Sequence, residues 1–155
     1  MGTMNTARNL GYGLGAGVLL FDVGKGALAT YLGLLLSSDA SLLPALVAGV
    51  GAVLGHVYPV WLGFKGGKAL ATTLGTTLPL FPVVGLTGLG LIIVLVLVTK
   101  RTPLSSVITV TAYPVLLLLS LFWRELPLSH LVQAVACALV IAAVVTYKHL
   151  PEFGA

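Results

Sequence analysis

Long apolar runs separated by short polar segments fill most of this 155-residue sequence. A helix that crosses a bilayer needs about 20 mostly apolar residues. By that measure the pattern predicts six membrane spans, at residues 11–36, 42–58, 69–80, 83–99, 104–123 and 131–147. The third is short and polar, so we expect it to be broken or re-entrant, buried in protein or lining a wet cavity. The predicted fold class is an all-α integral membrane bundle.

The composition excludes the soluble alternatives. Only 8% of the residues are charged and 58% are hydrophobic, whereas a soluble domain carries about 25% charged residues. A cytosolic globular enzyme, a disordered tail and a nucleic-acid-binding domain are therefore excluded. Because six spans leave no room for a soluble domain, we expect residues 1–155 to form a single transmembrane domain.

The basic residues gather on one side of the predicted spans. Those on the side of the N-terminus are Arg8, Lys65, Lys68, Lys100, Arg101 and Lys148. Arg124 lies alone on the other side, and Lys25 lies within a span. Since cytoplasmic loops carry an excess of Lys and Arg, the distribution predicts that both termini are cytoplasmic. The positive charge also suits anionic lipid head groups or an anionic substrate.

The segment after the second span has the chemistry of a phosphate site. Lys65 and Lys68 flank Gly66 and Gly67, and a helix is expected to begin just after them. Glycines let backbone N–H groups turn toward a ligand, and a helix N-terminus adds partial positive charge. The segment is not a nucleotide-binding P-loop, since Ala69 follows Lys68 where Ser or Thr is required. The alternative is a basic loop that only fixes the topology.

Three further groups are unusual near or inside an apolar span. Asp22 and Lys25 are three residues apart and share a helix face, either as a mutually neutralised pair or with Asp22 orienting Lys25 into a site. His56 is either structural or functional at the end of the second span. Arg8 either sets topology or binds phosphate with its planar fork. The three histidines are scattered and the acids are not clustered, so no metal site is expected.

These residues carry a resemblance to a known family. The sequence reads Gly55-His56-x-x-Pro59, then Phe64-Lys65-Gly66-Gly67-Lys68, then Ala71-Thr72-x-x-Gly75. This long pattern resembles the signature of the bacterial membrane acyl-phosphate:glycerol-3-phosphate acyltransferases (PlsY type). So does Asp22-x-x-Lys25-Gly26, and residues 2–11 look like the second half of that family's Gly-Ser-Gly-Asn-x-Gly-Ala-Thr-Asn loop. The matches cover the first 76 residues.

The resemblance implies an acyltransferase of phospholipid synthesis. It would transfer a fatty acyl group from acyl phosphate to the 1-hydroxyl of glycerol 3-phosphate, without a metal or organic cofactor, in the bacterial inner membrane with its active site on the cytoplasmic side. The expected catalytic residues are His56 and Asn5. The residues expected to bind substrate phosphates are Arg8, Lys25, Lys65, Gly66, Gly67, Lys68 and Thr72. The expected partners are the two substrates and membrane lipids, with no nucleic acid.

The sequence also departs from the family pattern. Ala69-Leu70 stands where the family has Gly-Val, and His149-Leu150-Pro151-Glu152 stands where it has His-Arg-x-Asn. The family has a further N-terminal span and the first half of the first loop, with a serine attributed to the active site. We therefore expect an N-terminally truncated chain.

The sequence is also compatible with two other classes of function. A small anion transporter would explain a lysine within a span and a re-entrant third segment. The later spans, however, offer few polar groups for a path across the membrane. A catalytically silent membrane scaffold is the other alternative, and truncation favours it.

Overall fold

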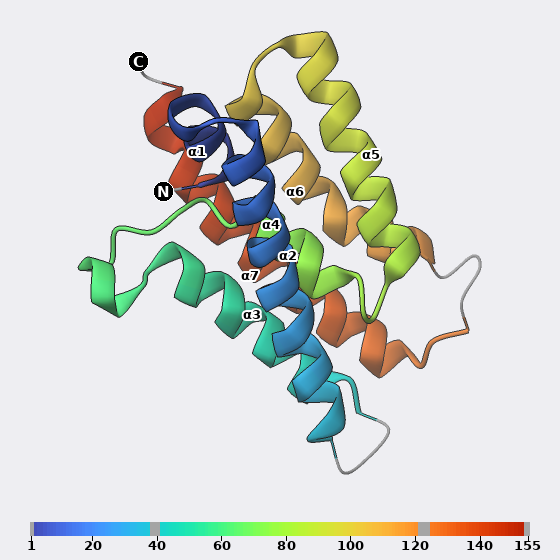
Figure 1. Ribbon diagram of the computed structural model, residues 1–155. Helices are drawn as coiled ribbons and strands as arrows, with labels where there is room; N and C mark the ends of the chain where they lie inside the picture. The colour runs from blue at the N-terminus through green and yellow to red at the C-terminus, as the bar shows by residue number, and fades with distance from the viewer. Residues whose placement is uncertain (1, 38–40, 121–124, 154–155) are drawn as a thin grey trace.

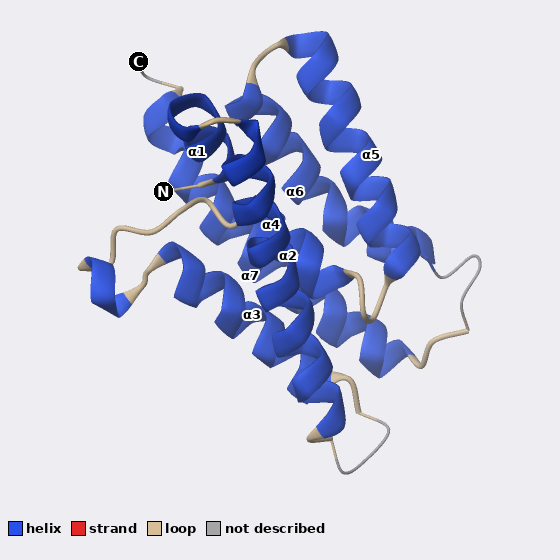
Figure 2. Cartoon of the chain, in the orientation of Figure 1, coloured by secondary structure: helices blue, strands red, loops and turns tan. Residues whose placement is uncertain are grey.

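The computed structural model describes residues 2–37, 41–120 and 125–153. In this part of the chain all regular structure is helical (Figure 2). The elements are α1 (Thr3–Leu10), α2 (Tyr12–Leu35), α3 (Leu43–Val57), the 3₁₀ turn η1 (Val60–Leu62), α4 (Leu70–Thr77), α5 (Pro82–Thr99), α6 (Thr102–Leu119), α7 (Leu128–His149) and the 3₁₀ turn η3 (Leu150–Glu152).

Five helical segments are long and apolar enough to cross a membrane, so this is a multi-pass membrane protein. They are α2, α3 continued to Leu62, α5, α6, and α7 continued to Glu152. Five of the six predicted spans are thus confirmed as long helices. The remaining one is α4, whose eight residues reach only about 12 Å and cannot cross a hydrocarbon core of about 30 Å. Arg124 and the predicted end of the 104–123 span lie outside the described residues.

The short helix α4 is buried in the bundle. It packs against α2, α3 and α5 and lies behind α2 in the centre of Figure 1. Two glycines permit a close approach: a Cβ on Gly26 would collide with the carbonyl oxygen of Thr72, and one on Gly75 with that of Val23. The segment was expected to be buried in protein or to line a wet cavity. The structure shows burial in protein, since Thr72, Thr73, Gly75 and Thr76 of α4 are all buried.

Prolines and one glycine set several helix boundaries. Pro44, Pro82 and Pro103 stand in the first turns of α3, α5 and α6, where a missing N–H costs no hydrogen bond. Gly11 has φ +97°, a backbone conformation open to glycine, and it separates α1 from α2. The helix α1 itself was not predicted, because its eight residues are mostly polar and contain no apolar run long enough to suggest a membrane span.

Buried hydroxyls and outward-facing apolar side chains characterise the packing. Large apolar side chains of α2, α5 and α7 are exposed, as expected for surfaces that face lipid. The buried Ser and Thr residues are Thr6, Thr30, Thr72, Thr73, Thr76, Ser105, Ser106, Thr109 and Ser120. Two apolar clusters complete the interior. One surrounds Phe81 and Tyr113, and the other surrounds Val57 and Val110.

Candidate functional site

Asp22, Lys25 and His56 form one group, here called the charged triad. Lys25 Nζ donates to Asp22 Oδ1 at 2.5 Å and lies 2.5 Å from His56 Nδ1. His56 Nδ1 is 3.3 Å from Asp22 Oδ1. The side chains of Asp22 and His56 are 8% and 9% exposed, whereas that of Lys25 is 30% exposed. The pair expected on α2 therefore forms, and the structure adds a histidine from α3 to it.

The contact with Lys25 defines the hydrogen-bonding roles of the two His56 ring nitrogens. An ammonium group can only donate hydrogen bonds, so His56 Nδ1 accepts from Lys25 when Lys25 carries its charge. The hydrogen of the neutral imidazole is then on Nε2. In the described part of the chain, no protein group hydrogen-bonds to this second ring nitrogen.

The segment 58–69, here called the basic loop, folds back onto the end of α3. The amide of Gly66 donates to Val57 O at 3.1 Å, and the amide of Gly67 donates to His56 O at 3.2 Å. A Cβ on Gly66 would collide with the His56 carbonyl oxygen, so only glycine fits there. The loop is therefore fixed to the same residue that the charged triad holds.

This finding changes the expected role of the two glycines. The sequence prediction directed the Gly66 and Gly67 amides toward a phosphate. Both amides instead bond to carbonyl groups at the end of α3, which lack partners within their own helix. In this conformation the glycines position the loop, and the lysines beside them carry its positive charge.

The two lysines of the basic loop differ in their surroundings. Lys65 is exposed, and Lys68 forms an ion pair with Glu152 from the C-terminal end of the chain. Just beyond Lys68, α4 begins after Ala69, which has φ +61°. The hydroxyl of Thr72, in the first turn of α4, is buried and has no hydrogen-bond partner in the described residues. This turn therefore offers a polar group beside the expected phosphate lysine.

Asn5 and Arg8 lie on α1. Asn9 Nδ2 donates to the backbone and side-chain oxygens of Asn5, both at 2.9 Å, and Arg8 is exposed. The helix packs against α2 where Ala7 meets Gly15. Among the described residues, no hydrogen bond or ion pair joins α1 to the charged triad or the basic loop. The structure thus brings Lys25, His56, Lys65, Lys68 and Thr72 into linked elements, with Asn5 and Arg8 on a neighbouring one.

Two residues at this end of the molecule were recognised in the sequence only as a departure from the family pattern, and no site role was predicted for them. Glu152 pairs with Lys68, and His149 is buried with its Nδ1 2.8 Å from Val145 O. One feature of the sequence could have identified Glu152. It is an acidic residue among several basic residues, which the charge distribution places on one side of the predicted membrane spans. In Figure 1, α1, the α5–α6 turn and the end of α7 do lie at one end of the bundle. No metal-ligating group of three or more His, Cys, Asp or Glu occurs in the described residues.

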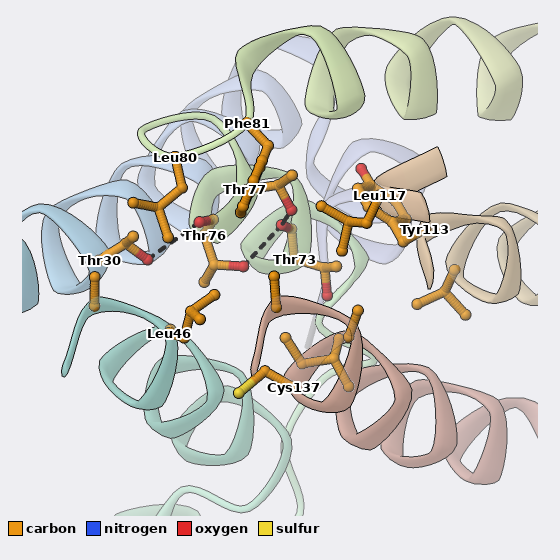
Figure 3. A pocket seen from close by; sticks show the side chains of 16 residues that line it. Thr30, Leu46, Thr73, Thr76, Thr77, Leu80, Phe81, Tyr113, Leu117 and Cys137 are labelled. Atoms are coloured by element: carbon orange, nitrogen blue, oxygen red, sulfur yellow. Dashed lines mark hydrogen bonds between the residues drawn. The ribbon is translucent and has the colours of Figure 1, made fainter. Parts of the chain in front are cut away.

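A cavity of about 40 Å³ lies elsewhere, between α4 and the surrounding long helices. It is called the threonine cavity here, because Thr30, Thr73, Thr76 and Thr77 line it together with apolar side chains and Cys137 (Figure 3). Each of these four hydroxyls donates to a backbone carbonyl, as Thr76 does to Thr73 O at 2.9 Å. None of the predicted site residues lines this cavity.

Known proteins match both the sequence and the fold. The glycerol-3-phosphate acyltransferase family profile matches residues 1–154. The glycerol-3-phosphate acyltransferase of Synechococcus sp. (strain CC9902) is 46% identical over 99 residues, which are 64% of this chain and 48% of that protein. The enzyme of Exiguobacterium sibiricum is 49% identical over 83 residues, 54% of this chain and 39% of that protein.

Two crystal structures of PlsY, an integral membrane glycerol 3-phosphate acyltransferase, share the fold. The lysophosphatidic acid form superposes with a TM-score of 0.85 at 29% identity, covering 99% of this chain and 74% of that one. The glycerol 3-phosphate form gives 0.84 at 28% identity, covering 99% and 72%. The chain spans about half the length of the curated relatives it matches. With a family match along nearly all of its residues, the chain belongs to the glycerol-3-phosphate acyltransferase family.

Proposed function

We propose that this chain acts in acyl transfer from a fatty acyl phosphate to the 1-hydroxyl of glycerol 3-phosphate. The hydroxyl oxygen attacks the acyl carbonyl carbon, and the bond between that carbon and the phosphate oxygen breaks. The products are lysophosphatidate and inorganic phosphate, and the departing phosphate takes up the hydroxyl proton. Family membership supports this reaction, and the names of the structural neighbours fit its substrate and product.

The observation that carries the proposal is the attachment of the basic loop to the charged triad through His56. The side chain of His56 is held by Lys25 and Asp22, while its carbonyl accepts the Gly67 amide. One residue thus fixes the position of the two loop lysines relative to α2. Such positioning suits a reaction in which both substrates carry a phosphate, because catalysis then depends on orientation and charge stabilisation.

The loop and α4 provide the groups for one phosphate. Lys65 and Lys68 supply ammonium groups, and the first turn of α4 begins beside them with the buried Thr72 hydroxyl, which has no hydrogen-bond partner in the described residues. Arg8 and Asn5, exposed on α1, are the candidates for the second phosphate. We assign the Gly66 and Gly67 backbone to loop positioning, because its amides are already bonded.

Within the charged triad, His56 is the candidate catalytic residue and Lys25 and Asp22 position it. His56 Nε2–H can donate to an oxygen that gains negative charge during acyl transfer, since Nδ1 accepts from Lys25. Lys25 was expected to bind phosphate directly. Its short contacts to Asp22 and His56 favour the positioning role instead.

We further propose that the protein resides in the bacterial inner membrane with both termini cytoplasmic. The positive-inside rule supports this orientation, since Arg8, Lys100 and Lys148 belong to elements at one end of the bundle. The soluble substrate would then reach the basic loop from the cytoplasm. The acyl chain would stay among the membrane helices.

The test is turnover by the purified protein in lipid nanodiscs supplied with palmitoyl phosphate and glycerol 3-phosphate. We expect lysophosphatidate and phosphate to appear in equal amounts, and glycerol in place of glycerol 3-phosphate to give neither. Lys65→Met should lower kcat/KM by about 10- to 100-fold, because the variant loses one hydrogen bond from a charged group to the substrate phosphate. Lys100→Met, an exposed lysine at the end of α5, is the matched control and should keep full activity. Absence of lysophosphatidate with the unaltered protein would contradict the proposal, and phosphate flux into liposomes would then favour a transporter.

A further inference from the structure

The ion pair between Lys68 and Glu152 joins two distant parts of the chain. Lys68 is in the basic loop, and Glu152 ends the 3₁₀ turn that follows α7. The turn is held by the Phe153 amide, which donates to Leu150 O at 3.1 Å. Just before it, His149 is buried at the end of α7, and its Nδ1 lies 2.8 Å from Val145 O of the same helix. Glu152 therefore lies on a short turn that follows a buried helix end, and it pairs there with Lys68.

Glu152 is also distinct among the acids. Of the acidic residues that the structure describes, Asp22 belongs to the charged triad and Glu125 is exposed just before α7. Glu152 is the acid in this set that forms an ion pair with a lysine of the basic loop. The side chains of Lys68 and Glu152 are 43% and 39% exposed. A dissolved anion can therefore reach the pair.

We propose that Glu152 is an intrachain competitor for the substrate phosphate, a carboxylate that holds Lys68 until the phosphate displaces it. The inference rests on the proposed function, in which Lys68 binds a phosphate. A phosphate monoester carries a charge of about −1.5 to −2 at pH 7, against −1 for a carboxylate. A phosphate dianion therefore attracts the Lys68 ammonium more strongly than the carboxylate does and can displace it. Because the same pairing must break before any anion binds Lys68, Glu152 weakens the binding of each of them by the same factor.

The expected size of the effect follows from the exposure of the pair. Exposed ion pairs contribute little free energy, and their loss changes an equilibrium by about two- to fivefold. Glu152→Gln keeps the shape of the side chain and removes the competing charge. It should therefore lower the KM of the substrate whose phosphate binds Lys68 by about two- to fivefold. It should also make chloride a stronger inhibitor.

The experiment compares Glu152→Gln with Glu125→Gln, the same substitution at an exposed acid outside the proposed site. The KM values of glycerol 3-phosphate and of palmitoyl phosphate are measured separately, so the substrate whose KM falls identifies the phosphate that Lys68 binds. Glu125→Gln should change neither value. Unchanged or raised KM values for both substrates in Glu152→Gln would overturn the inference.

A second arm separates this inference from the proposed function. The affinity for inorganic phosphate is measured by calorimetry in the same nanodiscs, without turnover. Glu152→Gln should bind phosphate about two- to fivefold more tightly than the unaltered protein, and this gain should vanish when Lys68→Met is also present. Equal phosphate affinity in the two proteins, or a gain that survives Lys68→Met, would overturn the role of Glu152. If the protein shows no turnover but the gain in phosphate affinity still depends on Lys68, only the proposed acyltransferase reaction is overturned.

Discussion

The threonine cavity satisfies its polar groups in a different way from the charged triad and the basic loop. In the triad and the loop, contacts cross between elements, from α2 to α3 in the charged triad and from the basic loop to η3 in the Lys68–Glu152 pair. In the threonine cavity, Thr73, Thr76 and Thr77 donate to carbonyls three or four residues earlier in the chain, and of the four threonines only Thr30 donates to another helix. Charges therefore specify the geometry of one region, whereas close packing specifies that of the other.

The physical reason lies in the cost of an unpaired group away from water. An uncompensated charge there is expensive and needs a partner, which for Lys25 is found on its own helix and on α3. A hydroxyl can donate a hydrogen bond to a backbone carbonyl of its own helix, so it does not need a partner on a neighbouring helix. We therefore expect substitutions in the charged triad to have larger effects than substitutions of the cavity hydroxyls.

The largest effect is expected from Asp22→Ala. The substitution leaves the Lys25 ammonium without its carboxylate in a largely buried site. Breaking a buried pair by removing one partner costs about 3–5 kcal/mol, and we expect about 3 kcal/mol because Lys25 is 30% exposed. The measurement is unfolding of the purified protein in micelles, followed by helical circular dichroism.

The matched control replaces both charges with apolar groups of similar size. Asp22→Leu combined with Lys25→Met should recover most of the lost stability, because no buried charge then lacks a partner. Turnover should remain low, since His56 loses the groups that hold Nδ1. A double variant as unstable as Asp22→Ala would contradict the electrostatic account and assign the loss to packing.

The next largest effect is expected where α2 and α4 touch. A Cβ on Gly26 would collide with Thr72 O and lie 3.0 Å from Thr76 N, and both are backbone atoms. Gly26→Ala should therefore cost about 1–3 kcal/mol and displace the first turn of α4, which lowers kcat/KM. Gly24→Ala, on the same helix with nothing within 4 Å of its Cβ, should be neutral or stabilising. Equal melting temperatures for the two variants would show that α4 is not tightly packed against α2.

A smaller effect is expected inside the threonine cavity. Thr30→Val removes the interhelical hydrogen bond from Thr30 Oγ1 to Thr76 O, which is 3.2 Å long. Its loss should cost about 1 kcal/mol and leave turnover unchanged. The control is Thr87→Val, an exposed hydroxyl bonded to Val83 O within α5, which should change stability by less than about 0.5 kcal/mol. A large loss of turnover in Thr30→Val would connect the cavity to the reaction.

The sequence predicted the long helices well, because their apolar length is a direct signal. The predicted boundaries of the segments at 11–36 and 42–58 differ by one residue at each end from α2 and α3. The ends of α6 and α7 are less well placed: Thr102 and Leu128 precede the predicted starts by two and three residues. Helix α1 has no apolar run to reveal it, and its packing depends on the contact of Ala7 with Gly15.

For the candidate site, the sequence predicted the residue types but not their pairings. Asp22 and Lys25 are neighbours through helix periodicity alone. The third member, His56, is 31 positions from Lys25, and no local pattern encodes that contact. The bonding of the Gly66 and Gly67 amides depends on how the loop folds, so the sequence could not show that these amides donate to carbonyls at the end of α3.

The smallest effect is expected at Ala69, where the two regions meet at the start of α4. Ala69 has φ +61°, which costs a residue with a side chain about 1–2 kcal/mol relative to glycine. Its methyl group is buried beside Val57 and Val110, which contributes about 0.8 kcal/mol, and glycine would add about 0.5–1 kcal/mol of unfolded-chain entropy. These contributions nearly cancel, so Ala69→Gly should change the free energy of unfolding by less than about 1 kcal/mol. Ala71→Gly, in the right-handed part of α4, should cost about 1 kcal/mol. Thermal unfolding of both variants is decisive: if Ala69→Gly proves the more damaging, the buried methyl rather than the left-handed backbone controls this junction.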